Sequence, residues 1–212
     1  MCKSKIPVIL LFILILPVAN ICFAGVDIGL SLDRDGLKSF HLAVGEHYQV
    51  PEKELVVVRE AKVSDEELPV VFYLAGRAGV STQAIIKLRL DGKSWMDISA
   101  HCGLGPEIYY VSLKTDPGPP YGNAYGHFKN RNRNEWRNIK LTDDDIVNFV
   151  NLKFLSEHYG YSPDEIVKMR AKGQDFISVN TEIKKNKGQS KKDYTSNSKS
   201  QGKGKGKGKG KK

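Results

Sequence analysis

Apolar residues recur at helical spacing in two stretches of the chain that closely match each other. The stretch from Gly79 to Ile98, GVSTQAIIKLRLDGKSWMDI, recurs 81 residues later as GYSPDEIVKMRAKGQDFISV, from Gly160 to Val179. A weaker third copy, EHYQVPEKELVVVR, runs from Glu46 to Arg59. Self-similarity at a fixed offset is typical of repeat folds. We therefore expect copies of one helical unit near residues 40–60, 64–103 and 142–182.

Start and stop signals define the helices of each unit. In the later copy Ser162 is a helix N-cap, Pro163 occupies the first helical position, and Glu165 completes a capping box. Gly173 then stands where a left-handed residue ends a helix. The apolar segment before each clear copy begins with a capping residue followed by acids, SDEE or TDDD. Each unit is thus expected to be a helix, a glycine turn, a second helix, another glycine turn and a short third helix.

Two interpretations fit this unit. The run LRLDGKSWMDISAHCGL resembles the helix, glycine turn and helix of bacterial DNA-binding domains. In the alternative, the copies are plain helical repeats whose glycines end helices, while Trp95 and Phe176 fill the core. Arg89 and Arg170 are then structural residues that pair with acids of a neighbouring helix. We favour the plain repeat, because short motif matches have a high false-positive risk.

The first 24 residues are typical of a secretory signal peptide. Lys3 and Lys5 precede an apolar run that is too short to span a membrane comfortably, and small residues precede a cut ahead of Gly25. The alternative is a lipoprotein anchored at Cys22, which we disfavour because a large residue precedes that cysteine. We expect an exported protein, periplasmic or secreted. One cysteine, Cys102, would remain after cleavage, so no internal disulfide is predicted.

The start of the mature chain shows a different pattern. From Val26 to Leu32 apolar and polar residues alternate, and this period of two predicts a short strand. The following DRDG, Asp33 to Gly36, predicts a turn. The three valines from Val56 to Val58 would also suit a strand, but their alignment with the later copy favours a helix.

Charge divides the chain into two parts. Residues 184–212 hold twelve lysines and one acid, a net charge of +11, while residues 25–183 hold 19 basic and 23 acidic residues, a net charge of −4. The end of the chain has almost no apolar side chain, so we expect a disordered Lys/Gly-rich tail. Its lysines suit any dense polyanion, and those nearest the end are Lys203, Lys205, Lys207, Lys209, Lys211 and Lys212. A solubilising tail with no fixed partner is the alternative.

Residues 103–141 separate the two clear copies and show no helical period. A long loop inside a domain is often functional, and this one concentrates aromatic and basic residues. Such residues can stack on sugars or bases and pair with phosphates. The candidate ligand-binding residues are Tyr109, Tyr110, Tyr121, Tyr125, Arg131, Arg133, Trp136 and Arg137. In the alternative, the tyrosines pack the loop onto the helices and the arginines are solvated.

No catalytic motif stands out in the chain. The GKS at Gly92 lacks the upstream glycine of a phosphate-binding loop, and the five histidines show no metal-binding spacing. His101 and Cys102 are neighbours on a helix, so their side chains point in different directions. We therefore predict no enzymatic activity and no cofactor.

The signal peptide, the helical S-x-x-x-[IV]-x-x-x-R-x-x-G modules and the Gly-Lys tail together resemble a group of exported bacterial proteins to which no activity is assigned. The resemblance covers Phe40 to Val179 loosely, and it implies a mostly helical fold without implying a ligand.

The sequence thus predicts an all-α fold in residues 25–183, with tandem helix-turn-helix-like repeats, one long Pro/Gly/Tyr-rich loop and a short N-terminal strand. We expect an exported binding or envelope-associated protein whose tail contacts an anionic polymer or surface, such as nucleic acid, lipopolysaccharide or anionic lipid. No specific protein partner is predicted. Two alternatives remain: a cytoplasmic helix-turn-helix protein that binds nucleic acid, and an envelope enzyme that uses the 103–141 loop.

Overall fold

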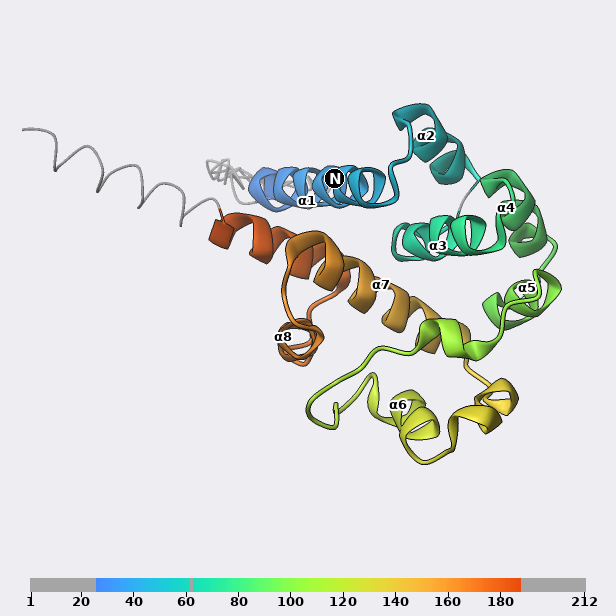
Figure 1. Ribbon diagram of the computed structural model, residues 1–212. Helices are drawn as coiled ribbons and strands as arrows, with labels where there is room; N and C mark the ends of the chain where they lie inside the picture. The colour runs from blue at the N-terminus through green and yellow to red at the C-terminus, as the bar shows by residue number, and fades with distance from the viewer. Residues whose placement is uncertain (1–25, 62, 188–212) are drawn as a thin grey trace, which may run out of the picture.

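A computed structural model describes residues 26–61 and 63–187, with side chains from residue 34 onward. The described chain is helical and contains no strand, which confirms the predicted fold class. Two central helices, α3 and α7, pack against each other, and the other helices lie around them (Figure 1). In chain order the elements are α1 Val26–Tyr48, α2 Glu52–Glu60, η1 Asp65–Glu67, α3 Leu68–Ala78, α4 Thr82–Leu90, α5 Trp95–His101, η2 Pro106–Tyr109, α6 Gly122–Lys129, η3 Arg133–Asn138, α7 Asp143–Tyr159 and α8 Pro163–Arg170. A last helix covers residues 176–187.

The repeat defines the helices at its core. Each clear copy consists of a long helix, a second helix and a third: α3, α4 and α5 in the first copy, and α7, α8 and the 176–187 helix in the second. The glycines between them adopt left-handed conformations in matched pairs, with φ of 66° and 73° at Gly79 and Gly160, and 81° at both Gly92 and Gly173. A side chain is strained in that conformation, so these glycines end their helices as the sequence predicts.

The matched aromatic residues also occupy matched environments. Trp95 and Phe176 are both 0% exposed, as expected for residues that fill a core. The predicted N-caps are present as well: Ser81 accepts a hydrogen bond from the amide of Ala84, and Ser162 and Glu165 form a capping box. Burying a large aromatic side chain contributes roughly 1.5–3 kcal/mol relative to leaving it exposed. The repeated aromatic residue is therefore a core residue in both copies.

The predicted strand at Val26 to Leu32 and the turn at Asp33 to Gly36 are wrong, because both lie within helix α1. In an alternating pattern, residues four positions apart are of the same type. A helix also places residues four apart on one face, so the pattern fits a helix as well as a strand. Gly36 has a role that a turn signal does not suggest. A Cβ atom at Gly36 would lie 3.0 Å from Oγ1 of Thr181, so its missing side chain lets α1 approach the last helix.

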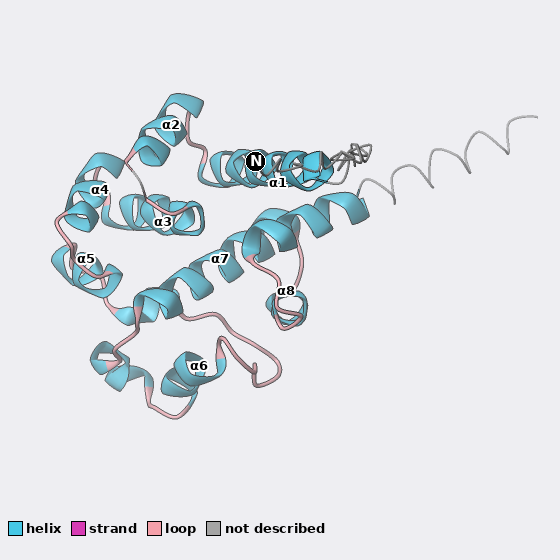
Figure 2. Cartoon of the chain, turned by 180° about the vertical axis from the view of Figure 1, so that it is seen from behind, coloured by secondary structure: helices cyan, strands magenta, loops and turns pink. Residues whose placement is uncertain are grey.

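That last helix also corrects the predicted start of the tail at Lys184. Residues 184–187 continue the helix, and two of its lysines donate to neighbouring carbonyl groups. Nζ of Lys187 donates to the carbonyl oxygen of Tyr159 at 2.7 Å, and Nζ of Lys184 donates to that of Ser39 at 3.4 Å. Lysine stems can lie along a protein surface while their charged ends reach polar groups. The middle of α1 and this helix therefore lie side by side (Figures 1 and 2).

The segment between the copies is more ordered than the absence of a helical period suggests. It contains η2, α6 and η3, which lie at the opposite end of the molecule from α1 and α2 (Figure 2). Its aromatic residues hold it in place: Phe128 is 1% exposed and packs edge to face against Phe149 of α7, with ring centroids 6.0 Å apart. Side-chain burial orders this segment, and no periodic pattern is needed for that.

Candidate functional site

The aromatic residues proposed as a ligand-binding face in residues 103–141 lie mostly inside the protein. Tyr109 and Tyr121 are each 1% exposed, Tyr125 is 7% exposed and Trp136 is 9% exposed. Tyr110 is half-buried, and its ring centroid lies 4.7 Å from that of Trp136. These rings pack against one another and against the helices, as in the alternative interpretation. Little of any ring face remains for stacking on a ligand.

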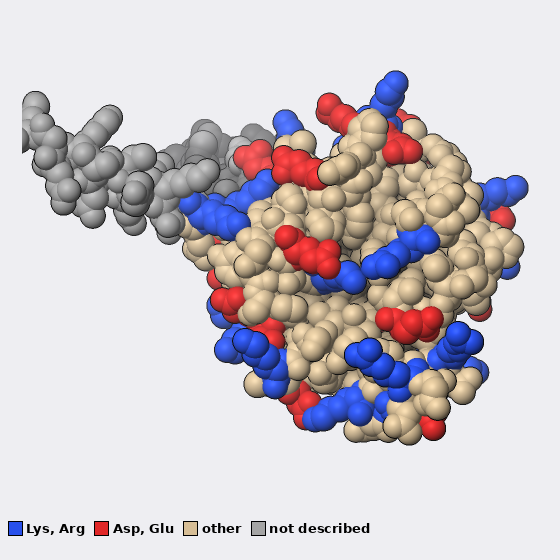
Figure 3. Space-filling model, viewed as in Figure 1, with Lys and Arg blue, Asp and Glu red and all other residues tan. Residues whose placement is uncertain are grey.

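The basic residues of the same segment lie on the surface. We call residues 129–140, KNRNRNEWRNIK, the basic segment; it holds five basic residues and one acid, a net charge of +4. All five basic residues are exposed, including the proposed Arg131, Arg133 and Arg137. Trp136 anchors the segment, because its indole N–H donates to the carbonyl oxygen of Phe128 at 3.1 Å. Lys and Arg side chains are frequent along the lower edge of the molecule, where this part of the chain lies (Figure 3). The proposed tail lysines, Lys203 to Lys212, lie outside the described residues.

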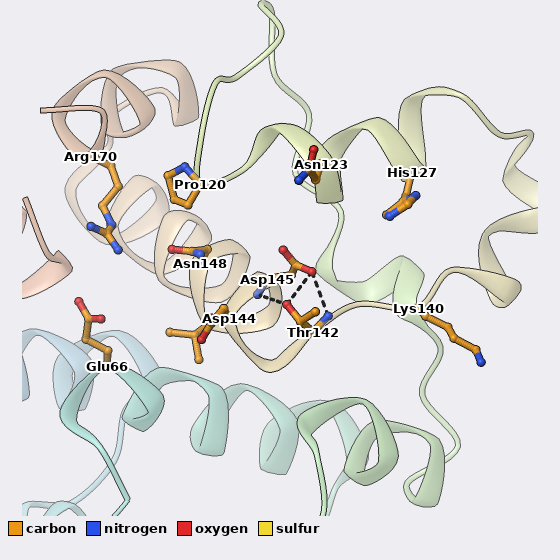
Figure 4. Close-up of a pocket in the computed structure, with 11 residues that line it drawn as sticks. Glu66, Pro120, Asn123, His127, Lys140, Thr142, Asp144, Asp145, Asn148 and Arg170 are labelled. Atoms are coloured by element: carbon orange, nitrogen blue, oxygen red, sulfur yellow. Dashed lines mark hydrogen bonds between the residues drawn. The ribbon is translucent and has the colours of Figure 1, made fainter. Parts of the chain in front are cut away.

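A polar cleft opens beside the basic segment, between α6 and the start of α7 (Figure 4). Its volume is about 620 Å³. Glu66 and Arg170 extend toward each other at one end, His127 and Lys140 lie at the other, and the start of α7 forms the floor between them. The lining residues are Glu66, Pro120, Asn123, His127, Lys140, Thr142, Asp144, Asp145, Val147, Asn148 and Arg170. This cleft is not predictable from the sequence, because its residues come from four separate stretches of the chain.

The arginine of the first copy is surrounded by acids. Arg89 donates through Nη1 to Asp143 at 2.6 Å and through Nη2 to Glu67, and its guanidinium lies 4.6 Å from the centre of the Trp95 ring. The same two acids also bind Trp95: its backbone N–H donates to Asp143 at 2.7 Å, and its indole N–H donates to Glu67 at 2.9 Å. Burial alone would lower the pKa of Arg89, but Asp143 and Glu67 together raise it above its ordinary value. The predicted pairing of this arginine with acids of neighbouring helices is confirmed.

The equivalent arginine of the second copy keeps only part of this arrangement. The guanidinium of Arg170 lies 4.5 Å from the centre of the Phe176 ring and donates to the carbonyl oxygen of Gln174, just as Arg89 contacts Trp95 and the carbonyl oxygen of Lys93. Glu66 accepts the backbone N–H of Phe176 at 2.7 Å, in the position that Asp143 takes at Trp95. Among the described residues, however, no carboxylate lies within 4 Å of the Arg170 guanidinium.

Two fully buried polar atoms of this region, neither of which is exposed in the cleft, have no hydrogen-bond partner among the described residues. They are Nε of Arg170 and the hydroxyl oxygen of Tyr121. Burial raises the pKa of Tyr121, the positive charge of Arg170 lowers it, and Glu66 raises it again, so the hydroxyl stays protonated at neutral pH. Buried polar groups in folded proteins nearly always have partners, and each exception calls for an explanation. Only the repeat alignment pointed to Arg170, and no sequence signal pointed to Tyr121 as its neighbour.

The two EHY motifs of the chain, which begin at Glu46 and Glu157, also lie against each other. His47 at the end of α1 and His158 at the end of α7 lie with ring centroids 6.0 Å apart. Each histidine faces the acid of the other motif: Nε2 of His47 lies 3.7 Å from Glu157, and Nε2 of His158 lies 3.7 Å from Glu46. Each histidine therefore lies near the glutamate of the other motif, and these contacts join the end of α1 to the end of α7.

Burial is the main cause that lowers the pKa of both histidines. The neighbouring acids oppose this effect, Glu157 at His47 and Glu46 at His158, whereas His47 itself and the lysines of the last helix lower the pKa of His158 further. Within residues 26–61 and 63–187, no group of three or more His, Cys, Asp or Glu side chains is placed to hold a metal ion. With both pKa values lowered, the rings are uncharged at neutral pH, and they pack edge to face.

The helix that would read DNA in the helix-turn-helix interpretation is α5. Trp95, Ile98 and Ser99 of α5 are buried, and Asp97, Ala100 and His101 face the solvent. A recognition helix normally carries lysine or arginine for phosphate contacts, and α5 contains neither. Its exposed face therefore gives this interpretation no support.

Comparison with known proteins does not assign a function. No protein-family model, curated protein or solved structure matches the chain. The resemblance to exported bacterial proteins stays a prediction. Geometry and charge are therefore the basis for any functional proposal.

Proposed function

We propose that this protein is an exported binding protein that contacts anionic polymers or surfaces through cationic parts of its chain, and that it acts by binding rather than by catalysis. The observation that carries the proposal is the separation of charge. Residues 188–212 hold nine lysines and one acid, and the basic segment adds a net charge of +4 on a folded part that is otherwise acidic. Lysine and arginine contacts with a polyanion are strengthened by the release of its counterions.

The two cationic parts differ in how they are presented. The basic segment is held on the surface by Trp136, whose indole N–H donates to Phe128, and Arg133 lies 5.4 Å from the centre of the Trp136 ring. The tail repeats lysine and glycine from Lys203 onward, and lysine contacts with phosphates carry no sequence information. We therefore assign most of the affinity to the tail and a smaller share to the basic segment. Binding is expected to be nonspecific among DNA, heparin and anionic lipid vesicles.

Titration of matched variants at two salt concentrations tests this proposal. The first variant ends at Lys187, so that the last helix stays intact, and the second replaces Arg131, Arg133 and Arg137 with alanine. A control replaces the exposed Lys53, Lys87 and Lys93, which removes the same charge from a distant surface. We expect the shortened protein to lose most of its affinity for heparin. The arginine variant should lose less affinity than the shortened protein but more than the control.

Salt dependence and localisation supply the remaining checks. Affinity should fall steeply between about 50 and 200 mM salt, because several phosphates or sulfates are neutralised together. If the shortened protein keeps its affinity and the arginine variant loses it, the basic segment is the site and the assignment to the tail is wrong.

Fractionation with N-terminal sequencing tests export: an intact Met1 recovered from the cytoplasm would overturn it. Among the described residues, no helix combines the length and the apolar character needed to cross a bilayer.

A further inference from the structure

The weaker copy of the repeat is a third structural unit, formed by α1, α2 and the start of α3. Helix α2 begins and ends 30 residues before α4, and η1 begins 30 residues before α5. Gln49 has a left-handed φ of 54°, as expected at the position where both clear copies have a left-handed glycine. Leu68, Ile98 and Val179 occupy equivalent positions in the three units, and all are fully buried. The three units can therefore be compared residue by residue.

Each clear copy buries an aromatic ring beneath its arginine. The guanidinium of Arg89 lies 4.6 Å from the centre of the Trp95 ring, and that of Arg170 lies 4.5 Å from the centre of the Phe176 ring. Both rings are fully buried. The pair of guanidinium and ring is thus a constant feature of the two clear copies, six residues apart in the sequence.

The third unit has the arginine but lacks the ring. Arg59 stands at the arginine position, and Asp65 stands six residues later, where the other units have an aromatic residue. The carboxylate of Asp65 turns toward α1, with its Oδ1 2.6 Å from Nε2 of His41. Arg59 is exposed, and none of the described residues forms an ion pair or a cation–π contact with it.

A cavity of about 500 Å³ lies at the place of the missing ring. Its lining comes from α1, α2 and the segment that leads into α3, namely Leu37, Val56, Arg59, Glu60, Val63 and Asp65. At the same positions the first copy has Glu67, Ile86, Arg89, Leu90, Lys93 and Trp95. Of these, Glu67 and Arg89 contact the indole of Trp95 directly. The cavity therefore corresponds to the space that the aromatic ring fills in the first copy.

The walls of this cavity leave apolar surface uncovered. Val56 is 41% exposed, whereas Ile86, its equivalent in the first copy, is 6% exposed. Leu37 replaces Glu67, which accepts the indole N–H of Trp95. The third unit thus has an apolar side chain where the first copy accepts a ring N–H. An apolar ring suits this position better than indole does.

We propose that this cavity binds the aromatic ring of a small molecule, with the ring packed on Leu37 and Val56 and covered by the guanidinium of Arg59. A guanidinium over the face of an aromatic ring is attracted by the negative face of the ring. The bound ring would complete the third unit as Trp95 and Phe176 complete the other two. No residue of the basic segment lines the cavity, so this site is separate from the proposed polyanion contacts.

Nuclear magnetic resonance titration of the full-length protein with benzyl alcohol tests the site. Cyclohexylmethanol is the matched probe, because it has the same polar group on a saturated ring of similar size. We expect saturable shifts at the methyl groups of Leu37, Val56 and Val63 with both probes. Benzyl alcohol should bind about two- to fivefold more tightly, as expected for a cation–π contact at an exposed site.

A pair of charge variants on α2 tests the role of the arginine. Arg59→Gln should lower the affinity for benzyl alcohol about two- to fivefold and leave the affinity for cyclohexylmethanol unchanged. Lys53→Gln removes the same charge from an exposed position of the same helix that does not line the cavity, so it should leave both affinities unchanged.

A second pair of variants fills the cavity from within. Asp65→Phe restores an aromatic residue at the repeat position and should abolish the saturable shifts. Asp65→Asn also removes the charge but leaves the cavity open, so it should still bind benzyl alcohol. If Asp65→Phe does not fold because the contact with His41 is lost, Val56→Phe fills the cavity from its outer wall and keeps that contact.

Three results would overturn the proposal. The first is the absence of saturable shifts at the three methyl-bearing residues. The second is equal affinity for the aromatic and the saturated probe, because the ring face would then not be recognised. The third is unchanged binding of benzyl alcohol to a folded variant whose cavity is filled by phenylalanine.

Discussion

Replacing Asp143 with alanine is expected to destabilise the protein severely, because this one side chain joins the two copies. Its Oδ1 accepts the backbone N–H of Trp95 at 2.7 Å and its Oδ2 accepts from Arg89 at 2.6 Å. A hydrogen bond to a charged group contributes about 1.5–3 kcal/mol. The ion pair is one-third exposed, so solvent screening limits its share to less than about 1 kcal/mol. We expect the free energy of unfolding to fall by about 2–4 kcal/mol.

The neighbouring acid is the matched control. Asp144 lies in the same first turn of α7 and carries the same charge near the helix N-terminus, but its side chain contacts neither Arg89 nor Trp95 in the described structure. Asp144→Ala should therefore lose only the interaction with the helix dipole, about 0.3–1 kcal/mol.

Thermal unfolding followed by circular dichroism measures both variants. For a domain of this size 1 kcal/mol corresponds to about 2–4 °C, so Asp143→Ala should melt about 5–15 °C lower and Asp144→Ala only a few degrees lower. A double-mutant cycle with Arg89→Ala should give a coupling energy well above zero, because the two residues are in direct contact. Equal effects of the two aspartate variants would refute the reasoning.

Other substitutions and conditions have equally definite expected outcomes. Gly92→Val and Gly173→Val should each lower the free energy of unfolding by at least about 1 kcal/mol in denaturant titrations, because both positions have φ of 81°; unchanged stability would contradict the left-handed turns. Gly36→Val should lower the melting temperature, because its side chain would force α1 away from the last helix; an unchanged value would contradict that close packing. Since burial lowers the folded-state pKa of His47 and His158, the unfolded chain binds more protons, and stability present above about pH 6.5 should be lost as the pH falls toward their lowered folded-state pKa values. Replacing both histidines with glutamine should flatten this dependence of melting temperature on pH, and a slope that persists in the double variant would assign it to other groups.

Local signals made much of the fold predictable. Ser162, Glu165 and the paired glycines act within a few residues of their own positions, so a capping box or a left-handed turn can be read from the adjacent sequence. The burial of Trp95 and Phe176 followed from the repeat, since two copies that keep an aromatic residue at one position place it in the same environment.

The errors arose where distant contacts decide the structure. Alternation from Val26 to Leu32 could not distinguish strand from helix, because both conformations place every fourth residue on one face. Residues 103–141 are ordered by burial of Tyr109, Tyr121 and Phe128, which no short-range pattern encodes. The last turn of the final helix depends on carbonyl groups of α1 and α7 that accept from its lysines.

The cleft was the least predictable feature. It forms where the start of α7, the end of α8, α6 and η1 meet, and none of these stretches is unusual by itself. The alignment matched Arg89 with Arg170, but the sequence could not show that their acid partners differ. That difference depends on which carboxylates the opposite copy brings to each arginine, and it becomes visible only when the copies are placed together.

The exchange of carboxylates between the copies has a consequence for how the chain can be divided. Asp143 of the second copy caps Trp95 of the first, and Glu66, which precedes the first copy's long helix, caps Phe176 of the second. Each half therefore supplies a group that completes the other, in the manner of two subunits of a symmetric dimer joined by a linker. A chain cut within residues 111–121 would yield fragments that are incomplete alone and complementary together, so restored folding after mixing would report their association.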